Sequence, residues 1–131
     1  MLLKLGKQFI GDVGAKPFFL EIATFTPHAP FTPAPRHEGM FPNLDAPRPP
    51  NFNKKGSDPP PWLAAMPKLD AADLDNIDKN FRKRVRSVQA IDEMLGELRA
   101  LVAKTPKLAN NTYIVFSSDN GFHLGEHALR S

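Results

Sequence analysis

The chain of 131 residues contains no cysteine. It therefore forms no disulfide, offers no thiolate ligand to a metal and holds no cysteine nucleophile. It also lacks any apolar run of the roughly 18–20 residues that a membrane-spanning helix needs. Its formal net charge is only +3, which is too small to indicate nucleic-acid binding by itself. These absences leave a globular chain of about one domain.

Proline is nearly absent outside one segment of the chain. Twelve of the 14 prolines lie between Pro27 and Pro67. Because proline fixes φ and removes a backbone donor, this window can hold neither a long helix nor a central strand. We therefore predict a long irregular loop over residues 26–68, ordered by its own apolar anchors. The anchors are four aromatic residues: Phe31, Phe41, Phe52 and Trp62.

Regular structure is predicted on both sides of this loop. Residues 1–14 have the pattern of a helix end, and the apolar segment 17–25 is typical of a buried strand. After the loop, apolar residues recur at steps of three and four over 70–104, which predicts a long amphipathic helix with Asp70 at its N-cap. The segment 112–118 predicts a second buried strand.

A strand, a long helix and a second strand in this order form a βαβ unit. We therefore predict the α/β class, with a mostly parallel sheet. Ligands in such sheets bind beyond the carboxyl ends of the strands. This rule points to two places in the chain. One is the turn that contains His28, and the other is the segment 119–131, which begins with Asp119 and Asn120.

The side chains at these two places have identifiable chemistry. Asp119 and Asn120 supply hard oxygen donors, which suit Ca²⁺ or Mg²⁺ rather than a soft metal. Followed by Gly121, they also have the composition of an ordinary turn, so a metal site and a simple turn both remain open. His28 lies between two prolines and is either aimed at an anion or an ordinary surface histidine.

Two motifs together resemble those of the sulfatases. Residues 16–20, leading into Pro-His-Ala-Pro at 27–30, resemble the strand and histidine loop of that family. Residues 112–127 are similar to its second metal-binding strand. Four segments between these motifs are similar to the N-acetylglucosamine-6-sulfatase branch in particular: Ala46-Pro47-Arg48, Asn51-Phe52-Asn53, Trp62-Leu63 and Phe81-Arg82-Lys83-Arg84.

This resemblance implies an alkaline-phosphatase-like α/β fold and the hydrolysis of sulfated saccharides such as N-acetylglucosamine 6-sulfate. It implies that Asp119 and Asn120 are ligands of a Ca²⁺ ion. It also implies that His28 contacts the sulfate or the leaving oxygen. A formylglycine hydrate is the family's reactive group. Neither nucleic acid nor a membrane is expected as a partner, and the family location is secreted, periplasmic or lysosome-like.

Other features of the family are missing from the sequence. There is no Cys/Ser-x-Pro-x-Arg motif from which formylglycine is made, no N-terminal pair of aspartates and no lysine beyond His127. We therefore expect residues 1–131 to be part of a sulfatase catalytic domain. The rest of the sulfatase chain would complete the site, and these residues alone would be inactive.

Two alternative functions remain open. A phosphodiesterase or phosphonate hydrolase of the same superfamily commonly has Asp-His where this chain has Asp119 and Asn120, so the asparagine favours a sulfatase. A non-catalytic α/β interaction module would instead use the basic run at 82–86 to dock an acidic partner or a polynucleotide. Otherwise this run is the solvated face of the predicted helix.

Overall fold

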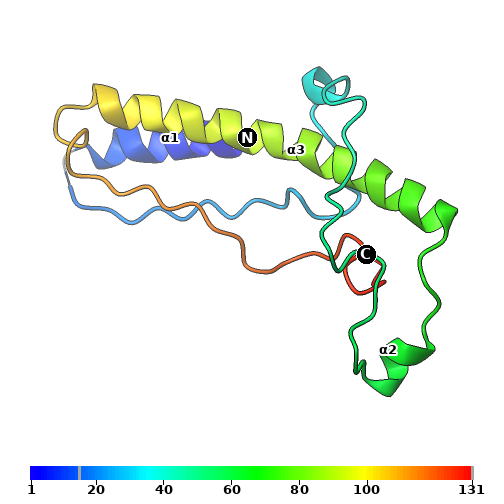
Figure 1. The fold of residues 1–131 in the computed structure, drawn as a ribbon. Helices are drawn as coiled ribbons and strands as arrows, with labels where there is room; N and C mark the ends of the chain where they lie inside the picture. The colour runs from blue at the N-terminus through cyan, green and yellow to red at the C-terminus, as the bar shows by residue number, and fades with distance from the viewer. Residues whose placement is uncertain (15, 131) are drawn as a thin grey trace.

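The computed structural model describes residues 1–14 and 16–130, whose regular structure is helical (Figure 1). The helices are α1 at Leu2–Val13, α2 at Pro61–Ala65 and α3 at Ala71–Lys104, with a 3-10 helix, η1, at Pro35–His37. Figure 1 shows α1 alongside the C-terminal half of α3, while α2 projects away from α3. The 34-residue helix α3 is the frame to which the other segments attach.

The start of α3 is fixed by a reciprocal cap. Asp70 accepts a hydrogen bond from Asp73 N at 2.9 Å, and the Asp73 side chain accepts one from Asp70 N at 3.1 Å. This capping box satisfies two backbone donors that the first helical turn leaves free. Asp73 also accepts two hydrogen bonds from Arg130, at 2.6 and 2.9 Å, so the C-terminal segment is tied to the same turn.

One core lies between α1, α3 and the first extended segment. Its buried residues come from both helices and from the turn after α3: Ile10, Leu98, Val102 and Leu108. Phe18, Leu20 and Ile22 pack against this core. Because these three are alternate residues, the segment presents one side to the helices, as an extended chain does. Gly6 permits the close approach, since a Cβ there would lie 3.2 Å from Ile22 and 3.4 Å from Leu98.

A second core joins the proline-rich loop to the N-terminal half of α3. Its buried residues lie on the loop, on α3 and on the C-terminal segment: Ala46, Leu69, Ile77 and Ala128. Phe52, Leu74, Phe81 and Leu124 pack against it. Asn53 closes the loop by a pair of side-chain hydrogen bonds, accepting from Leu69 N at 2.7 Å and donating to Leu69 O at 3.0 Å. The loop over 26–68 is thus anchored by side chains. Of its four predicted aromatic anchors, Phe52 packs here and Phe31 packs on Phe122, whereas Trp62 is 61% exposed and Phe41 is 38% exposed.

The two segments predicted to be buried strands do not pair into a sheet. Within residues 1–14 and 16–130, neither 17–25 nor 112–118 is assigned as a strand, and the β-pairing is one antiparallel bridge between Phe52 and Glu126. Tyr113 is 98% exposed and Val115 is 86% exposed, so the second segment is not buried. Parallel strands need neighbours and cover on both faces, which these residues do not supply to each other. The predicted βαβ sheet is therefore not formed by the described residues.

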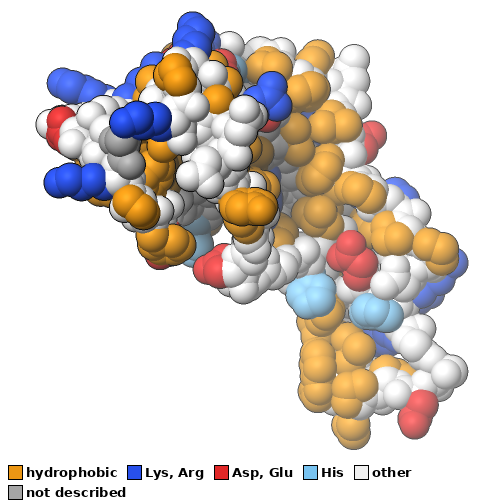
Figure 2. Space-filling model, turned by 90° about the vertical axis from the view of Figure 1, so that its left-hand side faces the viewer, with side chains coloured by type: hydrophobic (Ala, Val, Ile, Leu, Met, Phe, Trp, Pro, Cys, Tyr) orange, Lys and Arg blue, Asp and Glu red, His pale blue; other side chains and the backbone are white. Residues whose placement is uncertain are grey.

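Large apolar side chains remain on the surface of both segments. Phe19 is 85% exposed and Phe25 is 71% exposed, and Phe116 on the second segment is 67% exposed. Figure 2 shows hydrophobic side chains gathered over much of one face. Extended chain with unpaired backbone and exposed apolar side chains favours association. None of the helices described in residues 1–14 and 16–130 combines the length and apolar character needed to cross a membrane.

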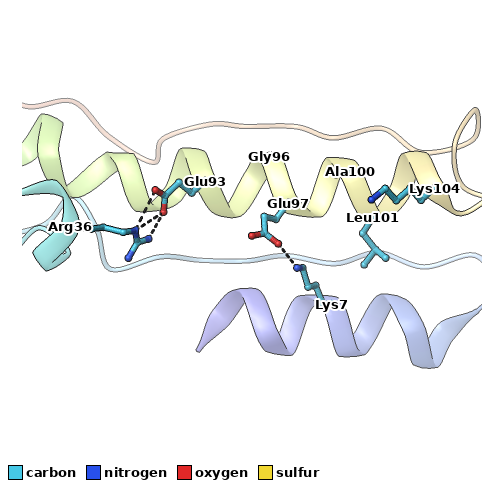
Figure 3. A pocket seen from close by; sticks show the side chains of 8 residues that line it. All are labelled: Lys7, Arg36, Glu93, Gly96, Glu97, Ala100, Leu101 and Lys104. Carbon is cyan, nitrogen blue, oxygen red and sulfur yellow. Dashed lines mark hydrogen bonds and ion pairs between the residues drawn. The ribbon is translucent and has the colours of Figure 1, made fainter. Parts of the chain in front are cut away.

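Ion pairs on α3 hold its neighbours in place (Figure 3). Arg36 Nε donates to Glu93 Oε2 at 3.0 Å, and the buried His37 donates from Nε2 to Glu93 Oε1 at 2.8 Å. Lys7 pairs with Glu97 and so links α1 to α3. Arg36 first, and then His37, lower the pKa of Glu93 to about 2 from its ordinary 4.5.

The shifted pKa of Glu93 predicts an acid-sensitive contribution to stability. Because the pKa is lower in the folded chain, the carboxylate stabilises the fold above pH 4.5, and this contribution is lost as the pH falls towards 2. The Tm difference between the native chain and Glu93→Gln should therefore be largest above pH 4.5 and shrink towards pH 2. Circular dichroism melts over this range measure it. Asp92→Asn, at an exposed neighbour, is the control, and a difference independent of pH would contradict the assignment.

Candidate functional site

His28 lies in a tight turn after the first extended segment, which we call the histidine turn (residues 25–31). His28 N donates to Phe25 O at 2.9 Å, and Phe31 N donates to His28 O at 3.1 Å. The imidazole lies 5.0 Å from the Phe25 ring, between centroids, and its Nδ1 is 3.0 Å from Ala29 O. The side chain is exposed. The turn therefore fixes the backbone of His28 and leaves its imidazole open to a ligand.

Asp119 and Asn120 lie at the end of the second extended segment, in what we call the Asp-Asn segment (residues 118–122). Ser118 Oγ donates to Asn120 O at 2.9 Å, which holds the backbone of the turn. Both Asp119 and Asn120 are exposed, and within the described chain neither side chain makes a hydrogen bond. Their carboxylate and amide oxygens are therefore available to a ligand.

Arg84 on α3 brings the histidine turn and the Asp-Asn segment together. The rings of Phe31 and Phe122 meet edge to face, with centroids 5.9 Å apart. The Arg84 guanidinium carbon lies 3.8 Å from the Phe122 centroid and 5.4 Å from that of Phe31. The guanidinium also donates to Pro27 O at 3.2 Å. Within residues 1–14 and 16–130, the convergence predicted from the strand order is therefore made by side chains and not by paired strands.

The environment of Arg84 is unusual for a cation. Partial burial lowers the pKa of its guanidinium from the ordinary value. The two aromatic rings compensate in part, because the negative face of an aromatic ring attracts a cation within about 6 Å of its centroid. Arg84 is therefore a structural cation held between three partners.

The segment after Phe122 is held by the proline-rich loop. Asn53 N donates to Gly125 O at 2.8 Å, and His127 N donates to Asn51 O at 3.0 Å. Asn51 Nδ2 lies 3.2 Å from His127 Nε2, so a side-chain contact accompanies the backbone pair. These contacts hold the chain that follows the Asp-Asn segment against the proline-rich loop.

Arg48 ties this part of the loop to α3. Its Nη2 donates to both carboxylate oxygens of Asp78, at 2.7 and 2.8 Å, and the guanidinium carbon lies 4.2 Å from the centroid of the Phe52 ring. Asp78 also accepts from Ala46 N at 2.9 Å. Hydrogen bonds between two charged groups are stronger than those between neutral groups, so this ion pair stabilises the attachment of the loop to α3. The Phe52 ring also contacts Gly125, which brings the C-terminal segment into the same cluster.

Gly125 is a position at which no other residue fits without strain. Its φ is +104°, and a Cβ there would lie 2.3 Å from Phe52 Cε2. We expect Gly125→Ala to lower the free energy of unfolding by about 2 kcal/mol or more, because backbone strain and a steric clash add. Gly121→Ala is the matched control, since a Cβ at Gly121 meets nothing within 4 Å. Urea denaturation measures both, and equal midpoints for the two variants would contradict this account.

The sequence left two interpretations of the basic run at 82–86, a solvated helix face or a docking surface, and the structure shows neither. Its three arginines bind the proline-rich loop and the histidine turn: Arg82 lies 3.6 Å from Asp45, Arg86 donates to Met40 O at 2.5 Å, and Arg84 binds Pro27 as described. The three arginines of the run therefore attach the proline-rich loop and the histidine turn to α3. The signal present in the sequence was the choice of arginine, which forms directed, planar contacts that lysine does not.

The side chains fit part of a metal site. Asp119 and Asn120 have the oxygen donors that Ca²⁺ prefers, and both are accessible. Over residues 1–14 and 16–130 there is no group of three or more His, Cys, Asp or Glu side chains able to hold a metal ion. Since Ca²⁺ takes about six to eight oxygen ligands, these two donors do not complete a site.

The chain belongs to the sulfatase family, because the Sulfatase family model matches residues 1–131. It is 34% identical to Sulfatase ppz1 of Metarhizium majus over 93% of this chain and 31% of that protein. It is 39% identical to human N-acetylglucosamine-6-sulfatase, over 87% of this chain and 21% of the relative. It is 30% identical to an arylsulfatase of Volvox carteri, over 86% and 20%.

The resemblance to sulfatases predicted from the motifs is thus confirmed, and N-acetylglucosamine-6-sulfatases are among the relatives at 36–39% identity. The family implies an alkaline-phosphatase-like α/β fold and generally uses a metal ion. The chain spans about a fifth to a third of the length of the curated relatives it matches. No solved structure matches it significantly.

Proposed function

We propose that this chain supplies part of the active site of a sulfuric ester hydrolase. The observation that carries the proposal is the meeting of the histidine turn and the Asp-Asn segment on one side of α3. An accessible imidazole and two accessible oxygen donors are thereby placed on neighbouring turns. Membership of the sulfatase family supports sulfate-ester hydrolysis as the reaction.

The proposed site residues have two roles, metal binding and proton transfer. Asp119 and Asn120 would hold a Ca²⁺ ion through their side-chain oxygens. A divalent cation, when bound, supplies charge that offsets the negative charge of the sulfate. His28 would hold a proton and give it to the leaving oxygen of the substrate, or stabilise charge there. The fixed backbone of the histidine turn limits the positions that the imidazole can reach.

The remaining parts of the proposed site come from outside these residues. The sequence has no cysteine, and no serine followed by x-Pro-x-Arg, so it supplies no formylglycine. The whole protein would provide the formylglycine, the other metal ligands and the sulfate-binding lysine. We propose sulfated saccharides such as N-acetylglucosamine 6-sulfate as substrates, because relatives at 36–39% identity are named N-acetylglucosamine-6-sulfatases.

We further propose a secreted or lysosome-like location. One relative, from Caenorhabditis elegans, is named a putative extracellular sulfatase and is 32% identical over 87% of this chain. Sulfated saccharides are large, charged molecules, and an enzyme acting on them must meet them in the compartment that holds them.

The partial donor set predicts weak calcium binding by this chain alone. Two protein donors leave most of the coordination shell to water, so the Kd should be about millimolar. NMR titration with CaCl₂ should shift the amides of residues 119–121, and Asp119→Ala should remove the shifts. Asp58→Ala, at an exposed aspartate of the proline-rich loop, should leave them unchanged. Micromolar binding that requires Asp119 would mean that a complete site exists in these residues.

A chimera tests the proposed reaction directly. The matching segment of human N-acetylglucosamine-6-sulfatase is replaced with residues 1–131, and release of sulfate from N-acetylglucosamine 6-sulfate is measured. We expect hydrolysis that falls about 100-fold or more in Asp119→Ala and in His28→Ala, because a metal ligand and a proton donor are lost. Asp58→Ala is again the control.

Two results would contradict the proposed function. One is a folded chimera whose sulfate release is unaffected by either variant. The other is a chimera that hydrolyses a phosphate diester in preference to the sulfate ester, which would favour the related phosphodiesterases.

A further inference from the structure

We propose that Arg84 is a positioning residue that sets the separation of the histidine turn from the Asp-Asn segment. A role of Arg84 in catalysis rests on the function proposed above. Its effect on the distance between the two segments does not depend on that function. Arg84 belongs to the segment Phe81-Arg82-Lys83-Arg84 of the family resemblance. The resemblance gives it no role, and the roles proposed for His28, Asp119 and Asn120 do not involve it. The proposal comes from the three contacts of its side chain.

The guanidinium of Arg84 contacts both segments at once. It lies over the ring of Phe122, at 3.8 Å from the centroid, and it donates to Pro27 O at 3.2 Å. Phe122 is two residues from Asn120, and Pro27 is adjacent to His28. A planar guanidinium can stack on a ring with its face and donate hydrogen bonds from its edge, a combination that an ammonium group does not offer.

The backbone of Arg84 is itself well fixed. It lies inside the long helix α3, and the neighbouring Ser87, 2% exposed, donates from Oγ to Arg84 O at 2.8 Å. Arg82 and Arg86, one on each side, bind Asp45 and Met40 O of the proline-rich loop. The position of the Arg84 Cα is thus set by the helix, and its side chain transfers that position to the two segments.

Phe31, which packs on Phe122 beside Arg84, has a backbone conformation that is unfavourable for a bulky residue. Phe31 has a φ of +58°, in the left-handed region that bulky residues rarely adopt. Such a conformation persists only where the surrounding contacts hold it. The contacts around Phe31 are the hydrogen bond from its N to His28 O at 3.1 Å, the edge-to-face packing on Phe122, and the guanidinium of Arg84, 5.4 Å from the Phe31 centroid. Removing the guanidinium should therefore release the histidine turn.

Distances between spin labels test this proposal in the chain itself. Because the chain has no cysteine, Ala29→Cys and Gly121→Cys place one label in each segment without further changes. Both positions are exposed, and a Cβ at Gly121 meets nothing within 4 Å. Double electron–electron resonance should give a single narrow peak for this pair. A second pair, Lys4→Cys and Lys104→Cys, reports on the frame of α1 and α3 from exposed positions.

Three variants separate positioning from general stability. Arg84→Leu keeps an apolar stem but removes the guanidinium, and it should abolish the narrow peak of the first pair while leaving the second pair unchanged. Arg84→Lys keeps the charge without the planar fork, and it should restore the peak only in part. Lys83→Leu, an exposed charge removed from the same helical turn, should change neither pair.

A narrow distance peak for the first label pair in Arg84→Leu would overturn the proposal. Equal broadening of both label pairs in Arg84→Lys, with its helix content unchanged, would also overturn it. If Arg84→Leu loses its helix content, the result for Arg84→Lys decides: first-pair broadening with unchanged helicity supports the proposal, and a native distribution contradicts it. None of these measurements requires catalysis, so their failure would leave the proposed hydrolysis standing.

Discussion

The contact between the Arg84 guanidinium, the Phe122 ring and the carbonyl of Pro27 is the interaction on which the candidate site depends. His28 and Asp119 are 91 positions apart in the sequence. Within the described residues, no hydrogen-bonded ladder joins the extended segments that lead to them. Arg84 on α3 therefore brings the two turns together, as adjacent parallel strands would in a complete sheet. The rings of Phe31 and Phe122 flank the Arg84 cation, and their attraction for it offsets part of the cost of its partial burial.

The helices were predictable from sequence because their causes are local. Apolar steps of three and four residues indicated the long helix, and Asp70 was expected at its N-cap, where the structure has it. α3 spans Ala71–Lys104, against the predicted 70–104, and α1 spans Leu2–Val13 within the predicted 1–14. A helix satisfies its own backbone hydrogen bonds, so neither prediction required knowledge of the rest of the molecule.

The sheet could not be derived in the same way, because a strand needs a partner. The apolar runs at 17–25 and 112–118 were interpreted as buried strands from composition alone. The first packs one side on the helices through Phe18, Leu20 and Ile22, whereas the second leaves Tyr113 and Val115 in solvent. The convergence of the two loops was nevertheless anticipated by the rule for parallel sheets. The contacts that bring the loops together could not be predicted from any local pattern, because Arg84, Phe31 and Phe122 lie on three segments distant in the sequence.

The histidine turn and the Asp-Asn segment meet at Arg84. The most direct test is an aromatic NOE experiment on the unmodified chain with isotope-labelled phenylalanine. The account predicts cross-peaks between the ring protons of Phe31 and Phe122, whose centroids are 5.9 Å apart. It also predicts upfield shifts of the Arg84 side-chain protons, because the guanidinium lies 3.8 Å from the Phe122 centroid. Absence of the cross-peaks, with Arg84 protons at the positions of an unstructured peptide, would contradict it.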